Sequence, residues 1–343
     1  MEALILNPGS APLSRNIEDY PEGIIIPIDK PYRWTSADVI RKVKYAAIRY
    51  FGKKNLKVGH AGTLDPLATG VLLVCIGKAT KLAETLQSHD KEYVAGVTFG
   101  ATTPSYDLEK DIDRFFPHEH ITAEAVAEAL PAFLGEQDQI APLFSAKSVD
   151  GVRAYELARK LYKETGENPE ATSDFDTAAE SLLRVSRIHI TELELLSFTA
   201  NDTNGNTDCN TSGSSSLAEG EWKTVCEDRA TRGTTAGGPR SGGVSEANVR
   251  TTVSALPASE STASSRINVT DNSSLGLPLA SIRMACSKGT YVRAFARDLG
   301  EALGTGAHLD SLQRSRSGEF RVENALTVEQ TIGMLSGLQY SNN

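Results

Sequence analysis

Short apolar runs along the chain predict a set of strands. Residues 23–28 (GIIIPI) and 70–77 (GVLLVCIG) are continuous apolar runs of strand length, which is typical of buried strands. Residues 91–99, 183–197 and 279–287 alternate apolar and polar side chains, which predicts strands with one face on a core.

Apolar residues at helical spacing predict helices between these strands. Residues 36–52 carry Val39, Val43 and Ala47 on one face, begin at Ser36 as a possible N-cap and end at Gly52. Further helices are expected at residues 81–87, 122–133 and 290–303. Strands outnumber helices and follow no regular alternation. We therefore expect an α+β fold with a mixed, largely antiparallel sheet and flanking helices.

The pattern of apolar positions fails in two places. Residues 1–20 predict a flexible N-terminal extension. From residue 199 to residue 277, 41 of 79 residues are Ser, Thr, Gly or Asn. Such a segment cannot bury enough apolar surface to offset its chain entropy, so residues 199–276 are expected to be a disordered, low-complexity insertion. Because strands are expected on both sides, the insertion should connect two strands.

Composition excludes several classes of protein. The chain of 343 residues has 40% hydrophobic residues, no apolar run of transmembrane length and no basic leader before a hydrophobic stretch. Its four cysteines form no CxxC pair, which disfavours a zinc site. We expect a cytoplasmic protein with reduced thiols, no membrane segment and no metal.

The net charge of −9 conceals two basic segments. Residues 30–57 hold nine Lys or Arg and one acid, and residues 283–321 hold seven and four. If the two segments meet in space, they would form the basic face typical of nucleic-acid binding. A solvated helix surface would show the same charges, so charge alone leaves both interpretations open.

The stretch GHAGTLDPLATG, residues 59–70, contains one acid, Asp65. Its glycines are not followed by the Lys-Ser/Thr pair of a phosphate-binding loop, because Gly70 precedes Val71, Leu72 and Leu73. An Asp before a proline is by itself most often a turn residue. The stretch therefore places a single carboxylate just before a predicted apolar strand.

Four segments in order resemble the TruB-type pseudouridine synthases, which act on tRNA. They are DKPYRWTS at 29–36, GHAGTLDPLATGVLLVCIGKATKL at 59–82, KEYVAGVTFGATTPSYD at 91–107 and CSKGTYVRAFARDLGEALGTGAHLDSL at 286–312. A supporting match spans residues 139–159. The resemblance implies the pseudouridine synthase fold, with a catalytic domain formed by residues 21–198 and 277–325.

The resemblance also implies roles for individual residues. Asp65 corresponds to the essential catalytic carboxylate, acting as nucleophile or as base. The implied substrate-binding residues are His60, which holds the opened RNA loop, Tyr93, which stacks on the base, Arg293, which pairs with the aspartate, and Tyr291 and Leu312, which line the pocket. Among the basic residues, the candidates for RNA contact are Lys30, Arg41, Lys53, Lys54 and Lys57. Lys30 also belongs to an early motif that supports the catalytic loop.

The implied activity is isomerisation of the T-loop uridine at tRNA position 55, by a monomer without cofactor, metal or guide RNA. One alternative is an RNA chaperone that promotes tRNA folding, with secondary or lost catalysis. A methyltransferase is a weaker alternative, because no glycine-rich loop follows the first strand.

Several positions depart from the family pattern. Arg33 stands where glycine is common, Ala141 replaces a proline and Ser148 replaces a frequent lysine. The long insertion is also unusual. We expect residues 326–343 to be a short C-terminal tail, too short for a PUA domain.

Overall fold

The computed structural model describes residues 2–142, 144, 148–149, 152–153, 185–200, 267 and 269–337. These residues belong to one compact unit, Met1–Thr207 with Ser261–Asn343, while a second unit, Asp208–Glu260, lies outside the described residues. The strands are β1 Leu4–Ile5, β2 Ile24–Lys30, β3 Val58–Ala61, β4 Ala68–Ile76, β5 Lys91–Phe99, β6 Ala101–Thr102, β7 Arg114–Phe115, β8 Gly135–Gln139, β9 Ser148–Val149, β10 Val152–Arg153, β11 Ser186–Thr199, β12 Leu279–Cys286, β13 Ala307–Ser317 and β14 Phe320–Arg321. The α-helices are α1 Ser36–Phe51, α2 Ala83–Ser88, α3 Ala123–Ala129, α7 Val292–Ala302 and α8 Val328–Met334.

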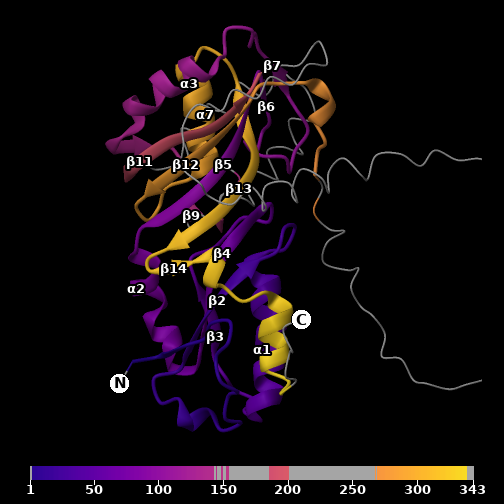
Figure 1. The fold of residues 1–343 in the computed structure, drawn as a ribbon, viewed down its shortest axis with the longest axis vertical. Helices are drawn as coiled ribbons and strands as arrows, with labels where there is room; N and C mark the ends of the chain where they lie inside the picture. Colours follow the sequence, from indigo (N-terminus) through magenta and orange to yellow (C-terminus); the bar gives the residue numbers. More distant parts are fainter. Residues whose placement is uncertain are drawn as a thin grey trace, which may run out of the picture. The chain divides into compact units, whose positions relative to one another are not determined.

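One large mixed sheet organises the described residues (Figure 1). Its main path runs β1-β2-β4-β13-β5-β12-β11-β8, with β3 paired to β4 and β14 paired to β13. Neighbours pair antiparallel except β1 with β2 and β4 with β13, which are parallel. The expected α+β class with a mixed, largely antiparallel sheet is confirmed.

The central strand β13 is absent from the sequence-based prediction, as are the short strands β3 and β8. Its sequence, AHLDSLQRSRS, contains few apolar residues, because two of its fully buried positions are His308 and Arg314. A pattern that equates buried with apolar cannot find such a strand. Its place between β4 and β5 becomes visible only through its backbone pairing with both strands.

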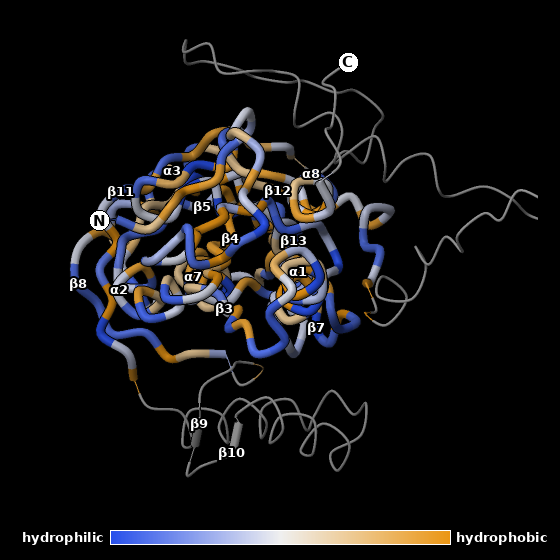
Figure 2. Tube along the Cα trace, turned by 90° about the horizontal axis from the view of Figure 1, so that it is seen from below, coloured by the Kyte–Doolittle hydropathy of each residue, from blue (hydrophilic) through white to orange (hydrophobic). Residues whose placement is uncertain are grey.

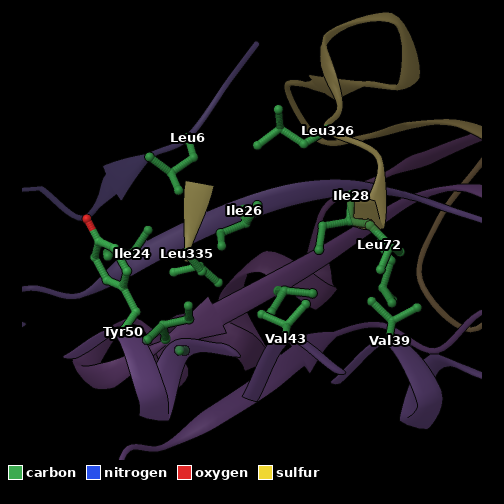
Figure 3. Close-up of a cluster of buried hydrophobic side chains, with 14 of the residues drawn as sticks. Leu6, Ile24, Ile26, Ile28, Val39, Val43, Tyr50, Leu72, Leu326 and Leu335 are labelled. Carbon is green, nitrogen blue, oxygen red and sulfur yellow. The ribbon is translucent and has the colours of Figure 1, made fainter. Parts of the chain in front are cut away.

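The first core lies where α1 and α8 pack on β2 and β4. Figure 3 shows side chains from α1, such as Val43, gathered with Ile26 of β2 and with Leu335 just after α8. Helix α1 begins with a capping box between Thr35 and Asp38, so the N-cap is Thr35 and not Ser36 as predicted. The predicted stop at Gly52 is confirmed, because Gly52 is the C-cap in the left-handed conformation. In Figure 2 hydrophobic stretches lie in the interior around β4, whose residues 71–76 are all apolar and fully buried.

The second core lies where α7 and α3 pack on β5, β12 and β11. Phe295 of α7 meets Phe133 edge-to-face, with 5.4 Å between ring centroids. The two cores share a boundary along β5 and β13, where Tyr93 and Leu312 contact both. This boundary is where the candidate site is found.

The N-terminal residues are folded, which corrects the expectation of a flexible extension over residues 1–20. Strand β1 pairs with β2, and Leu6, Leu13 and Ile17 are buried in the first core. The Tyr50 hydroxyl also donates a hydrogen bond to the carbonyl of Leu13. Beyond the short apolar run at residues 3–6, the apolar side chains are too widely spaced to form a strand or helix pattern, so their burial follows from the surface that α1 and β2 offer.

The segment after residue 325 is likewise part of the core and is no tail. Helix α8 begins with a capping box between Thr327 and Gln330. Val328 and Leu335 are buried against α1, and the backbone of Leu326 bonds to Asp29 and Pro27 of β2. Residues 338–343 lie outside the described residues.

The two strands expected to flank the insertion, β11 and β12, are antiparallel neighbours. Residues 201–266 and 268, which make up most of the predicted insertion, lie outside the described residues. Residues 269–276 are folded, which corrects the boundary predicted at 276. Asn272 is buried and bonds to His308, and the amide of Thr270 donates to the carbonyl of Leu108.

No helix among the described residues is long and apolar enough to cross a membrane.

The burial of Leu6 predicts a loss of stability on truncation. Leu6→Ala should lower the free energy of unfolding by about 2–5 kcal/mol, because it leaves a cavity beside α1. Leu4→Ala is the matched control, since Leu4 is 38% exposed and should cost less than about 1 kcal/mol. Urea denaturation measures both, and equal losses would show that the N-terminal residues do not contribute to the core.

Candidate active site

Asp65 lies on the loop between β3 and β4, and other elements hold the backbone of that loop. The Ser36 hydroxyl, at the start of α1, accepts from the amide of Leu64 at 2.9 Å and donates to its carbonyl at 3.1 Å. The Nζ of Lys30, at the end of β2, donates to the carbonyl of Pro66 at 3.2 Å. The loop is therefore tied to two elements of the first core on either side of Asp65.

The Asp65 carboxylate forms an ion pair with Arg293 of α7, from the second core. The Nε of Arg293 lies 2.9 Å from Oδ2 of Asp65, so the contact predicted from the sequence is present. Arg293 is 6% exposed, whereas the Asp65 side chain is 40% exposed. The pair therefore presents a carboxylate to solvent while its cation stays inside the protein.

A second carboxylate, Asp107, also lies beside the Nε of Arg293. Its Oδ2 lies 3.7 Å from the Nε of Arg293, and its Oδ1 accepts from the Ser105 hydroxyl at 2.6 Å and from the amide of Glu109 at 2.9 Å. Burial alone would lower the pKa of Arg293, but the charges of Asp65, Asp107 and Glu109 outweigh it and raise this pKa. The guanidinium therefore stays charged.

The remaining nitrogens of Arg293 are also bound. Nη1 donates to the carbonyl of Ser105 at 3.1 Å and Nη2 to that of Phe144 at 2.9 Å. Arg293 thus has one orientation, fixed from three directions, and its contact with Asp65 is its most exposed one.

The start of α7 is fixed by Gln139, at the end of β8. Its side-chain amide accepts from the backbone N–H of Tyr291 at 2.8 Å and donates to the Tyr291 carbonyl at 3.1 Å. Tyr291 is the N-cap of α7, and Arg293 is the second residue of this helix. The two hydrogen bonds from Gln139 therefore fix the position of the backbone that carries Arg293. Tyr291 is half-buried, and its role in lining the pocket stays a prediction.

Tyr93 and Leu312 lie at the boundary between the two cores. Tyr93 of β5 and Leu312 of β13 are half-buried and pack against both clusters of buried residues. Burial raises the pKa of the Tyr93 hydroxyl. A neutral aromatic ring at a partly open boundary offers a stacking surface for a base.

His60 lies on β3, five residues before Asp65 in the chain. Its ring is half-buried, and its Nδ1 has no hydrogen-bond partner within the part of the chain that the structure describes. Burial, together with the charge of Arg314, lowers the pKa of the imidazole, so the ring is neutral at pH 7. The Nδ1 atom is shielded from solvent, so the contact of His60 with RNA that the resemblance implies stays a prediction.

Lys30 is not positioned to contact RNA, which corrects one of the predicted RNA contacts. It is fully buried, and its Nζ donates to the carbonyls of Pro31, Trp34 and Pro66. Burial lowers its pKa to about 7, although the charges of Asp65 and Asp29 act in the opposite direction. Lys30 instead supports the loop that carries Asp65, in agreement with the early motif.

Comparison with known proteins gives consistent matches. Residues 49–213 match the model of the TruB family pseudouridylate synthase N-terminal domain, and residues 293–336 match that of the tRNA pseudouridylate synthase B C-terminal domain. The tRNA pseudouridine synthase B of Phocaeicola vulgatus is 40% identical over 91% of this chain and 92% of its own length. The corresponding protein of Bacteroides thetaiotaomicron is 39% identical over the same shares.

The chain belongs to the TruB family of pseudouridylate synthases. A chain in the crystal structure of a Cbf5-Nop10-Gar1 complex is also similar, with a TM-score of 0.49 and 20% identity over 94% of this chain and 59% of that chain. The C-terminal family model extends to residue 336 and so includes α8, in agreement with the packing of that helix.

The basic residues of this TruB-family chain divide between surface and interior. Arg41, Lys53, Lys54 and Lys57 are exposed, as expected for RNA contacts. Arg41 pairs with Asp38 at 2.8 Å and Lys53 with Glu18 at 2.7 Å. Lys54 and Lys57 line an open cavity of about 470 Å³, together with Lys44 and Thr80.

The second basic segment does not add to a common basic face. Arg293 and Arg314 are buried, and Arg283, Arg297 and Arg316 pair with acids. Arg293 and Arg314 therefore cannot contribute to a basic face, and acidic partners offset the charges of Arg283, Arg297 and Arg316.

Three residues that shape the site were not identified from the sequence: Asp107, Gln139 and Arg314. Asp107 ends the third motif, which was its only sequence signal. Gln139 begins the supporting match and Arg314 follows the fourth motif by two residues. A single sequence does not show that a polar residue will be buried against a partner 150 to 250 positions away.

The pKa of Lys30 predicts a pH dependence of stability. Because this pKa is about 7 in the folded protein, against 10.5 ordinarily, the unfolded chain binds more protons between these pH values. The free energy of unfolding should therefore rise with pH in that window, with a slope from Lys30 of up to about 1.4 kcal/mol per pH unit. Lys30→Met should remove that part of the slope.

The measurement is urea denaturation at several pH values from 7 to 10. Lys54→Met, at an exposed lysine, is the matched control and should leave the slope as in the wild type. Lys91, whose pKa is lowered to about 8 by burial, contributes equally to all three proteins. An unchanged slope in Lys30→Met would contradict the assignment.

Proposed function

We propose that the protein converts uridine to pseudouridine in tRNA, with Asp65 as the catalytic carboxylate. The observation that carries the proposal is the 2.9 Å ion pair of a half-exposed Asp65 with a buried Arg293, beside Tyr93, in a member of the TruB family. The similar proteins of Phocaeicola vulgatus and Bacteroides thetaiotaomicron are named as tRNA pseudouridine synthases, which supports tRNA as the substrate.

The chemistry fits the residues of the site. Pseudouridylation breaks the N-glycosidic bond of uridine, turns the uracil and joins its carbon to the sugar. The reaction is an isomerisation, so no atom or electron is gained or lost. A carboxylate can serve as nucleophile or as base, and the same group can act in both halves of the reaction. Arg293 holds that carboxylate in one place and stays charged throughout.

The target uridine must leave its stack to reach Asp65. Tyr93 supplies a ring face at the boundary of the two cores, worth about 1–3 kcal/mol of stacking per base. Leu312 lies at the same boundary, and Tyr291 and His60 are the further residues that we propose to contact the base and the opened RNA loop. We propose the T-loop uridine at position 55 as the target, bound by a monomer without guide RNA.

Asp65→Asn tests the catalytic role directly. It should reduce pseudouridine formation on a T stem-loop transcript by at least about 10³-fold, because the amide is neither nucleophile nor base. RNA affinity should stay within about threefold, since Arg293 keeps Asp107 as a partner. Sequencing of pseudouridine on the transcript gives both yield and position.

Asp138→Asn is the matched control, because Asp138 is an exposed acid paired with Arg187. It should retain full activity. Full activity of Asp65→Asn would contradict the proposed function, and pseudouridine at another uridine would contradict position 55. Equal promotion of tRNA folding by both Asp65 forms, with no pseudouridine from either, would favour an RNA chaperone.

The exposed lysines predict a salt-dependent contribution to RNA binding. Replacing Lys53, Lys54 and Lys57 by Gln should weaken tRNA binding and reduce the slope of log K against log salt by up to about 2–3, because each phosphate contact releases counterions. Replacing all three by Arg keeps the charge and should keep the slope. An unchanged slope in the Gln variant would show that these lysines are only solvated.

A further inference from the structure

Arg314 is a buried arginine at the centre of the sheet that the catalytic residues described above do not include. It is 2% exposed and lies on β13 between β4 and β5. Its Nε donates to the carbonyl of Val71 at 2.7 Å, Nη2 to that of Gly62 at 3.2 Å and Nη1 to that of Thr63 at 3.4 Å. In the described part of the chain, no carboxylate lies within ion-pair distance of its guanidinium.

A buried cation that has no carboxylate partner among the described residues is an expensive arrangement in a protein interior. The free-energy cost of desolvating the Arg314 guanidinium must be offset by the contacts that the guanidinium makes. Two of the three carbonyls belong to residues just before Asp65 in the catalytic loop. A guanidinium is planar and has five N–H donors in fixed positions, so a single arginine can bind several backbone carbonyls at once.

Arg314 completes the set of donors to the catalytic loop. Each backbone carbonyl from residue 62 to residue 66 accepts a hydrogen bond, in chain order from Arg314, Arg314, Ser36, the amide of Ala68 and Lys30. Arg314 alone holds the part of the loop that precedes Leu64. Without it, the two residues leading to Leu64 would lose their side-chain anchor.

Arg314 also joins this loop to the strand that carries Tyr93. In the sheet, Arg314 lies opposite Tyr93 on one side and Gly70 on the other. The approach to Gly70 is so close that a Cβ there would lie 2.3 Å from the Arg314 carbonyl oxygen. The charge of Arg314 also acts on the Tyr93 hydroxyl and on His60. The Asp65 loop, Tyr93 and His60 therefore all interact with the same residue, Arg314.

We propose that Arg314 is a positioning residue for the isomerisation, which sets the Asp65 loop and Tyr93 at a fixed separation across β4, β13 and β5. The expected effect on catalysis rests on the proposed function. The expected effect on the conformational order of the Asp65 loop is independent of that function. A carboxylate displaced by about 1 Å can lose about 10²-fold in rate. The effect should therefore fall on the chemical step and leave RNA binding largely unchanged.

Single-turnover kinetics with excess enzyme test the proposal. Arg314→Ala should lower the rate of pseudouridine formation at least about 100-fold, while the Kd for a T stem-loop stays within about threefold. Methylguanidinium at tens of millimolar should restore at least about tenfold of that rate, by filling the vacated site. Arg314→Lys, which keeps the charge but not the fork, should be intermediate.

Arg316→Gln is the matched control, because Arg316 lies two residues further on the same strand and its guanidinium contacts the Gly318 carbonyl and Glu92, not the catalytic loop. It should behave as the wild type. A rate within threefold of wild type in folded Arg314→Ala would overturn the proposal, as would a loss without any rescue by methylguanidinium. If Arg314→Ala does not fold, Arg314→Lys is judged by the same rate and Kd.

Amide hydrogen exchange separates this inference from the proposed function. In the protein without RNA, exchange at residues 62–68 should be faster in Arg314→Lys than in the wild type and in Arg316→Gln. A wild-type protein that makes no pseudouridine would contradict the proposed function, while this difference would still support the loop's dependence on Arg314. Equal exchange in all three proteins would overturn the inference.

Discussion

The ion pair between Asp65 and Arg293 is the contact on which the arrangement of the molecule depends. Its carboxylate comes from a loop of the first core and its guanidinium from a helix of the second. The two cores therefore have to meet at one defined separation for the pair to form at 2.9 Å. Asp107 and Gln139 act on the arginine side of this contact, and Ser36 and Lys30 on the aspartate side.

The site shows how buried charge is used to fix backbone in this fold. Lys30, Arg293 and Arg314 are all buried, and each donates to several carbonyl oxygens, at least one of them in another segment. Only Arg293 has carboxylate partners among the described residues. A cation that has lost its water must find many acceptors, so it holds those acceptors tightly in place. The consequence is a half-exposed Asp65 on a loop whose own carbonyls are all bound.

The returning end of the long insertion connects to the same region. The guanidinium of Arg33, a residue in the left-handed conformation where glycine is common in the family, donates to the carbonyl of Ile267 at 2.6 Å. Thr270 bonds to Leu108 and Asp111, next to the segment that holds Arg293. The departure at Arg33 and the insertion are therefore in contact, a relation that neither feature suggests by itself.

The sequence by itself determined the apolar strands, the main helices, the α+β class and, through ordered motifs, Asp65, Tyr93 and Arg293. These features depend on local periodicity or on residue order, and both can be read along a single chain. The tertiary structure alone decided that Lys30 is buried, that residues 2–20 and 326–337 belong to the core and that β13 is the central strand. In each case the deciding contacts join residues far apart in the chain. A polar residue such as Arg314 becomes a core residue only because other segments bring carbonyl acceptors to it.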